Sequence, residues 1–237
     1  MFKKYQIPSR SLIFQFFSDF CELKKLIVME MLNGIRNIIF DLGGVLLNID
    51  PKKTIEAFGK LGMKQLVGDK GLSYDHDIFY QMELGKVTSD EFRNGVNELL
   101  PQKVSFQEIN DAWTAMLLDF PVVRVELVKN LRKDFKIYLF SNTNAIHVEK
   151  IHSNFRNQHG FEVSSLFEKD FYSNEIGYRK PLPESYQEII RISGIDPNES
   201  LFIDDSLQNI ESAIEFGLKG FWLEPGQTVE KIFQEYL

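Results

Sequence analysis

Three short apolar runs in this 237-residue chain each end in polar residues that could do chemistry. Asp41 follows the run Ile35–Phe40, Ser141-Asn142 follows Lys136–Phe140, and Asp204-Asp205 follows Ser200–Ile203. A short apolar run that ends in turn or polar residues is typical of a buried strand, and ligands bind outside the carboxyl ends of parallel strands. Carboxylate oxygens suit a hard cation such as magnesium. The residue types therefore predict a site for a divalent cation beside a small anion.

A lysine completes this set. Lys180 follows a loop and precedes a predicted helix, so it can lie at the same edge of the sheet. A lysine and a metal ion would neutralise charge on a transferring phosphoryl group. A carboxylate close to the metal can act as a covalent nucleophile. Phosphoryl chemistry beside a metal ion is the hypothesis that these residue types favour.

Each of these residues also has a purely structural interpretation. Asp41 precedes glycine and could be a turn residue, Asp204 or Asp205 could cap the following helix, and Ser141 could be an N-cap. Lys180 could be a solvated surface lysine. Two adjacent carboxylates at a buried strand end repel each other, so a bound cation explains the pair more simply.

The elements that would position these residues alternate along the chain. Two further strands are expected at Lys169–Tyr172 and Leu218–Leu223, and apolar residues at helical spacing lie between the strands. Pro181 suits the first turn of a helix, while Gly194 and Gly217 suit C-terminal caps. The pattern predicts an α/β fold with a doubly wound parallel sheet.

One segment interrupts the alternation. Residues 51–121 show no convincing strand, but Thr88-x-x-Glu91 and Ser105-x-x-Glu108 match capping boxes, and Leu84-Gly85-Lys86 fits a turn between two helices. We therefore expect a core of residues 34–50 and 122–237, with residues 51–121 as an inserted helical cap. Residues 1–33 are expected to form an appendage, with a weakly amphipathic helix at Ser11–Ile27.

Composition excludes several other classes. A net charge of −7 disfavours a nucleic-acid surface, and a single Cys excludes an internal disulfide framework and a multi-thiolate zinc site. The apolar runs fall short of the roughly 20 residues that span a bilayer. The four His residues show no spacing that makes a site. We expect a cytoplasmic protein with neither nucleic-acid nor membrane partners, as a monomer or homodimer.

Four motifs carry a family resemblance. They are Ile38-Ile39-Phe40-Asp41-Leu42-Gly43-Gly44-Val45, Phe140-Ser141-Asn142-Thr143, Arg179-Lys180-Pro181, and Phe202-Ile203-Asp204-Asp205-Ser206 with Asn209. In this order and spacing they resemble the haloacid dehalogenase-like (HAD) hydrolases, from about residue 34 to residue 222. The stretches Phe-Ser-Asn-Thr-Asn and Gly-Tyr-Arg-Lys-Pro are similar to the bacterial sugar-phosphatase branch that contains alpha-D-glucose-1-phosphate phosphatases. The resemblance implies a Rossmann-like core with a cap.

The resemblance also implies a role for each matching residue. Asp41 would attack phosphorus and become an aspartyl-phosphate, while Ser141 and the Asn142 amide bind phosphate oxygens. Lys180 would bridge the phosphate and Asp41. Mg²⁺ would be held by Asp41, the Gly43 carbonyl, and Asp204 or Asp205. Asn209, four residues after Asp205, would orient that carboxylate.

One position departs from the family pattern. Many family phosphatases have a second Asp two residues after the nucleophile, which protonates the leaving group; here that residue is Gly43. A positioned acid or base contributes ~10² to 10⁴ in rate, so the change puts turnover in question without affecting metal binding. Two hypotheses remain: a magnesium-dependent phosphatase acting on a small phosphorylated metabolite such as a sugar phosphate, or a non-catalytic protein that binds magnesium and a phosphorylated ligand.

Two related families share part of the pattern. In a phospho-receiver domain the acidic pair comes with the first strand, whereas here it comes late in the chain. Halide-removing relatives lack the late acidic pair, so Asp204-Asp205 favours the phosphatase. The cap would exclude water and select the substrate. Glu83, Lys86 and Arg93 are the cap residues expected to face the site.

Overall fold

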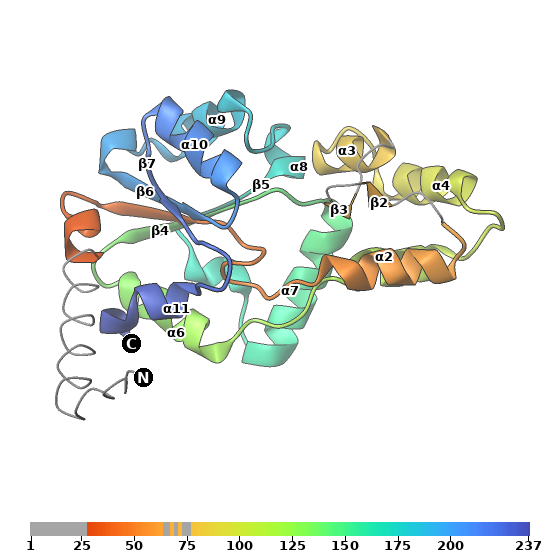
Figure 1. The fold of residues 1–237 in the computed structure, drawn as a ribbon, viewed down its shortest axis with the longest axis horizontal. Coiled ribbons are helices and arrows are strands. Elements are labelled where there is room, and N and C mark those ends of the chain that lie inside the picture. The colour runs from red at the N-terminus through yellow and green to blue at the C-terminus, as the bar shows by residue number, and fades with distance from the viewer. Residues whose placement is uncertain (1–27, 64–66, 69–70, 73–76) are drawn as a thin grey trace, which may run out of the picture.

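A five-stranded parallel sheet forms the centre of the molecule. The computed structural model describes residues 28–63, 67–68, 71–72 and 77–237, so the helix expected at Ser11–Ile27 lies outside the described residues. The sheet has the order β5-β4-β1-β6-β7 (Figure 1). Its strands are β1 (Asn37–Phe40), β4 (Lys136–Ser141), β5 (Lys169–Tyr172), β6 (Ser200–Asp204) and β7 (Lys219–Trp222). All five expected strands are confirmed, with ends that shift by one or two residues.

The register of the sheet determines which polar residues meet. Phe40 pairs with Leu139 on one side and with Ile203 on the other. Asp41 follows Phe40, Phe140-Ser141 follows Leu139, and Asp204 follows Ile203. These polar ends of the strands therefore lie side by side at one edge of the sheet. Asp41 is held there by its main-chain N–H, which donates to Ile203 O at 2.9 Å.

Helices cover both faces of the sheet, as the alternation predicts (Figure 1). Ile38 and Phe40 point to one face and Ile39 to the other, as the two-residue period of a strand requires. The first face packs against α6 (Val122–Leu131), α7 (Ala145–His159) and α11 (Val229–Ile232). The second packs against α9 (Pro183–Ser193) and α10 (Leu207–Phe216). The doubly wound α/β fold is confirmed.

Short helices lie in the connections. A one-turn helix, α8 (Ser173–Ile176), directly follows β5. Three 3₁₀ turns span Val163–Leu166, Pro197–Glu199 and Gln234–Tyr236. None of the helices within the described residues has the length and apolar character needed to cross a membrane.

Four helices form a bundle beside the sheet, which we call the α2–α5 bundle. Its members are α2 (Pro51–Lys60), α3 (Asp77–Glu83), α4 (Ser89–Leu99) and α5 (Phe106–Thr114). Phe58, Phe79, Phe92 and Trp113 form its aromatic core, with ring centroids 5.1–6.3 Å apart. Both expected capping boxes are present, at Thr88 and Ser105. Figure 1 shows the bundle projecting from one side of the sheet.

Two expectations for this region and its surroundings are wrong. A small antiparallel pair, β2 (Val67–Gly68) and β3 (Gly71–Leu72), lies in the segment expected to lack strands. Strands of two residues are too short to show a period in the sequence. The helix assigned to Pro181 begins at Pro183, and the Lys180–Pro181 peptide bond is cis. Both prolines suit a first helical turn, so composition alone did not separate them. The caps at Gly194 and Gly217 are confirmed.

Two neighbouring segments of the chain join the α2–α5 bundle to the sheet. Asp50 N–H donates to Met116 O at 2.9 Å, and Leu118 N–H donates to Asn48 O at 3.0 Å. Ile49 and Leu117 form an antiparallel bridge between them. The chain therefore leaves the core and returns to it at one place, directly beside the residues that follow β1.

Candidate active site

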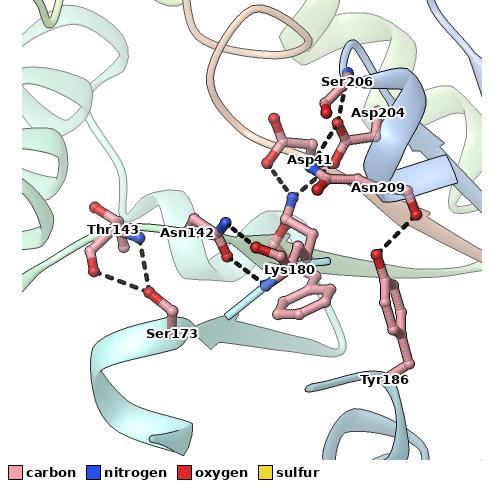
Figure 2. A network of polar contacts seen from close by, with 10 residues as sticks. Asp41, Asn142, Thr143, Ser173, Lys180, Tyr186, Asp204, Ser206 and Asn209 are labelled. Carbon is pink, nitrogen blue, oxygen red and sulfur yellow. Dashed lines mark hydrogen bonds and ion pairs between the residues drawn. The ribbon is translucent and has the colours of Figure 1, made fainter. Parts of the chain in front are cut away.

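Three carboxylates meet at the carboxyl edge of the sheet. Asp41 follows β1, Asp204 ends β6 and Asp205 comes next, and oxygens from all three lie within 4.8 Å of one another. Asp41 and Asp204 are buried, and Asp205 is exposed. Figure 2 shows Asp41 and Asp204 converging on Lys180. The sequence prediction that these residues meet in space agrees with this arrangement.

Lys180 is the centre of the buried part of the site. Its Nζ lies 2.6 Å from Asp41 Oδ1, 2.7 Å from Asp204 Oδ2 and 2.9 Å from Phe140 O (Figure 2). Nζ also lies 5.1 Å and 5.2 Å from the ring centroids of Phe140 and Phe202. An ammonium group has three N–H donors, and here each has an acceptor. Lys180 thereby fixes the two carboxylates relative to each other.

Asp204 has further donors of its own. Asn209 Nδ2 lies 3.0 Å from Oδ1 and 3.1 Å from Oδ2, and Ser206 N–H donates to Oδ1 at 2.8 Å. Asn209 therefore orients Asp204, whereas the sequence spacing had assigned it to Asp205. The reason is that Asp204 ends a buried strand, and its side chain points back under the first turn of α10. Tyr186 O–H donates to Asn209 O at 2.8 Å and supports that turn (Figure 2).

The Ser141–Thr143 segment is tied to two other loops. The Asn142 side chain donates to Lys180 O and accepts from Lys180 N–H, both at 2.9 Å. Ser173 Oγ donates to Thr143 O at 3.0 Å and accepts from Thr143 N–H at 2.9 Å. The Asn142 side chain thus holds the loop that carries Lys180 in place.

Burial and like charge shift the acid–base behaviour of the site. Burial raises the pKa of Asp41 to about 7, with Asp204 and Asp205 adding to the rise and Lys180 opposing it. Burial and the neighbouring Asp204 also raise the pKa of Asp205. The carboxylates of Asp204 and Asp41 raise the pKa of Lys180 against the effect of burial, so this lysine stays charged. Three carboxylates against one ammonium leave an excess of negative charge that one divalent cation would neutralise.

The donor set fits a hard cation. Carboxylate oxygens converge from the ends of β1 and β6, and Gly43, in the turn after β1, lines the same pocket. Gly44 in the same turn has φ +78°, and a Cβ there would overlap the Asp205 carboxylate. A glycine is therefore required for Asp205 to approach the turn so closely. Oxygen ligands with room for retained water are what Mg²⁺ takes.

The eight site residues predicted in the α/β core all line one pocket of about 420 Å³. These residues are Asp41, Gly43, Ser141, Asn142, Lys180, Asp204, Asp205 and Asn209. The volume lies in the range of pockets for small molecules. The pocket wall next to Gly43 is aliphatic, because Ile49 packs there: a Cβ at Gly43 would lie 3.1 Å from Ile49 Cδ1.

His147, which is not among the predicted site residues, also lines the pocket. It lies in the first turn of α7, three residues after its cap Asn144, and its Nε2 is 2.9 Å from Trp113 O. Burial lowers the pKa of His147 to about 4, so the ring is neutral at pH 7. Its partner lies on α5, 34 residues away, so spacing among the four His residues gave no signal for it.

The three cap candidates have different positions. Glu83 forms an ion pair with Arg179, with Oε2 and Nε 3.1 Å apart, and Arg179 also lies over the Tyr80 ring. Arg93 pairs with Asp90 and contacts Asn110 and Phe106 within the bundle. None of Glu83, Lys86 or Arg93 is among the described residues that line the pocket. Glu83 instead joins the bundle to the loop that carries Lys180.

The fold and the site together define a hydrolase of the α/β class with an acidic metal site. The chain belongs to the haloacid dehalogenase-like hydrolases: the model of that family matches residues 35–217. It is 34% identical over 194 residues to D-ribitol-5-phosphate phosphatase of Bacteroides thetaiotaomicron, which covers 81% of this chain and 93% of that protein.

Solved structures agree with this assignment. A HAD family enzyme from Bacteroides thetaiotaomicron, in complex with magnesium and inorganic phosphate, superimposes with a TM-score of 0.76 and 37% identity. The match covers 84% of this chain and 99% of that one. A HAD-like family hydrolase from Porphyromonas gingivalis superimposes with a TM-score of 0.75 and 29% identity, covering 85% of this chain and 97% of that one.

Proposed function

We propose that this chain is a magnesium-dependent phosphatase that hydrolyses a small phosphomonoester, with a sugar or sugar-alcohol phosphate as substrate. The observation that carries the proposal is the buried contact of Lys180 with both Asp41 and Asp204. It holds one carboxylate ready to react and another ready to bind a cation. The D-ribitol-5-phosphate phosphatase and the magnesium–phosphate complex among the relatives support the same chemistry.

Asp41 is the proposed nucleophile. One of its carboxylate oxygens forms a bond to phosphorus while the bond from phosphorus to the ester oxygen breaks, and the alcohol leaves. A water molecule then attacks phosphorus in the aspartyl-phosphate, which releases inorganic phosphate and regenerates the carboxylate. Lys180 favours the ionised form of Asp41, because its ammonium lies 2.6 Å from Oδ1.

The remaining residues bind and orient. Ser141 and the main-chain N–H of Asn142 are proposed to bind phosphate oxygens, and the hydrogen bonds of Asn142 and Ser173 hold that segment in place. Because Lys180 already donates to three acceptors, it contacts a phosphate oxygen only by sharing one of those protons. Asp41, Gly43 O, Asp204 and Asp205 would hold the magnesium ion, which supplies positive charge next to the phosphoryl group.

The leaving group has no acid at residue 43. A Cβ on this residue would lie 3.1 Å from Ile49 Cδ1, so a side chain here would need a small shift of Ile49. Departure of the alcohol then relies on water or on the intrinsic stability of the leaving oxyanion. Anomeric phosphates and other esters of acidic alcohols meet that requirement better than simple alkyl phosphates.

A direct assay tests the proposal. Release of inorganic phosphate is measured from a panel of sugar and sugar-alcohol phosphates with magnesium, for the native chain and for Asp41→Asn. We expect Asp41→Asn to reduce kcat by at least about 10⁴-fold, since the covalent route is lost. Asp134→Asn, at an exposed carboxylate at the opposite end of the strands, is the matched control and should retain native activity.

The non-catalytic alternative gives a different result in the same panel. A binding protein would be stabilised against heat by a phosphorylated ligand in the presence of magnesium, without release of phosphate. That outcome from the native chain, across the whole panel, would replace the phosphatase by the binder.

A further inference from the structure

The imidazole of His147 is fixed from two directions in the pocket wall. Its ring stacks on the Trp113 indole, with centroids 4.7 Å apart and planes at 29°. Nε2 lies 2.9 Å from the Trp113 carbonyl oxygen. A carbonyl oxygen can only accept, so Nε2 carries the hydrogen, and in the neutral ring Nδ1 is then an acceptor.

The neutral form is the stable one in this environment. The side chain is buried and, with burial lowering its pKa to about 4, the ring carries no charge at pH 7. Within the described residues no hydrogen bond reaches Nδ1, while the residue itself lines the pocket that contains Asp41. The wall therefore presents a neutral acceptor whose tautomer is set by the α5 carbonyl behind it.

The pocket that His147 lines also has aliphatic side chains in its wall. They are those of Leu47, Ile49, Met116, Leu117 and Ile151. The polar groups at the carboxylate end are used by the metal and the phosphate in the proposed reaction. A hydroxyl group of a bound substrate on the aliphatic side would lose its hydration, and Nδ1 is the ring atom placed to replace it.

We propose that Nδ1 of His147 accepts a hydrogen bond from a substrate hydroxyl and thereby selects phosphate esters of hydroxylated alcohols. This specificity-determining role rests on the proposed phosphatase function and narrows its substrate class. A site built to bond a hydroxyl discriminates strongly against the analogue that lacks it, because the acceptor is then left buried without a partner.

Two substitutions separate the two nitrogens of the ring. A glutamine places its amide N–H₂ near the position of Nε2, so His147→Gln keeps a donor for Trp113 O and removes the acceptor. An asparagine places its amide near the position of Nδ1, so His147→Asn keeps an acceptor there and loses the contact with Trp113 O. Thermal unfolding of both variants shows whether each one is folded under assay conditions.

The probes are D-ribitol 5-phosphate and n-pentyl phosphate, which have the same carbon number and differ in their hydroxyls. For the native chain we expect kcat/KM to be at least about tenfold higher with the ribitol ester. His147→Gln should lower that value ~10- to 100-fold for the ribitol ester and less than about threefold for the pentyl ester. His147→Asn should retain most of the preference.

The outcomes are decisive in both directions. A native chain that cleaves both esters with equal kcat/KM overturns the inference, and this ratio needs no variant. If His147→Gln lowers kcat/KM equally for both esters, the role of His147 is structural, and the inference is overturned. If kcat/KM falls for neither ester, His147 has no role in selecting the substrate, which also overturns the inference. If the native chain releases phosphate from neither ester nor from the wider panel, the proposed function itself fails.

Discussion

At the residue scale, the position two residues after Asp41 has no acidic side chain. It is Gly43, and a Cβ there would lie 3.1 Å from Ile49 Cδ1. Without a positioned acid, the rate should depend strongly on how well the leaving oxygen carries negative charge. Changing the substrate, rather than the protein, is the direct way to measure that dependence.

Aryl and alkyl phosphates give the comparison. We expect kcat for an aryl phosphate such as p-nitrophenyl phosphate to exceed that for an alkyl phosphate by ~10² or more, which is the factor that a general acid would otherwise supply. Steady-state kcat values with saturating magnesium provide the measurement. Equal rates on the two esters would mean that another group protonates the leaving oxygen, and the absence of an acid at Gly43 would have no kinetic consequence.

His147 connects protonation to stability. Its pKa falls from 6.5 to about 4 on folding, chiefly because burial disfavours the charged ring. The unfolded chain therefore binds more protons between these values. The stability that the neutral ring contributes is fully present above pH 6.5 and is lost as the pH falls toward 4.

We expect this group alone to account for a loss on the order of 3 kcal/mol between pH 7 and pH 4. Urea unfolding of the native chain and of His147→Gln at pH 7.5, 6 and 5 isolates the contribution of His147 to the free energy of unfolding, because the other titrating groups are common to both proteins. The free energy of unfolding of the native chain should fall more steeply below pH 6.5. Parallel curves for the two proteins would show that His147 is not the group responsible.

At the element scale, the α2–α5 bundle is held against the core by a few particular contacts. Glu83 at the end of α3 pairs with Arg179, which adjoins Lys180. Two residues later, Gly85 has φ +66°, and a Cβ there would overlap the main-chain oxygen of Asn174 in α8. Because Ser173 of α8 bonds Thr143, the turn after α3 lies against the element that supports the Ser141–Thr143 segment.

Gly85→Ala should push this turn away from α8. We expect kcat/KM to fall tenfold or more, in addition to a loss of about 1 kcal/mol in stability from the left-handed backbone. Gly160→Ala is the matched control, because Gly160 has φ +80° with nothing within 4 Å of a Cβ. It should lose only the cost of the left-handed backbone, about 1 kcal/mol, and keep its kcat/KM within about twofold. If Gly85→Ala behaved like this control, the contact with α8 would have no part in activity.

The sequence predicts features that depend on neighbouring residues better than features that depend on residues far apart in the chain. Apolar runs and capping boxes are local, so the five strands and the N-termini of α4 and α5 were predicted well. Contacts between distant elements leave no local trace. Three contacts of this kind are the ion pair of Glu83 with Arg179, the hydrogen bond of His147 to Trp113, and the hydrogen bond of Asn209 to Asp204.

At the scale of the whole molecule, the site depends on the complete fold. Asp41 and Asp204 are 163 positions apart in the chain and meet only when β1 pairs with β6. An unfolded chain has no such cluster, so a cation that binds here stabilises the folded state over the unfolded one. Binding of a cation by the three carboxylates and the order of the sheet would thus be linked through one equilibrium.

Magnesium should therefore raise the melting temperature. At a concentration 100 times its Kd it adds about 2.7 kcal/mol, which corresponds to about 5–10 °C for a chain of this length. Asp204→Asn should lose most of this increase, while Asp134→Asn should keep it. Calorimetry with and without a chelator provides the measurement, and an unchanged melting temperature of the native chain would argue against the carboxylate cluster as a cation site.

The strand order has a consequence for biosynthesis. β1 lies in the middle of the sheet, yet its neighbour β6 is translated only after β4 and β5. A nascent chain on the ribosome has Asp41 and Lys180 before β6 is made, but neither Asp204 nor Asp205. Catalytic competence then arises late in translation, so prematurely terminated products would be inert toward cellular phosphate esters.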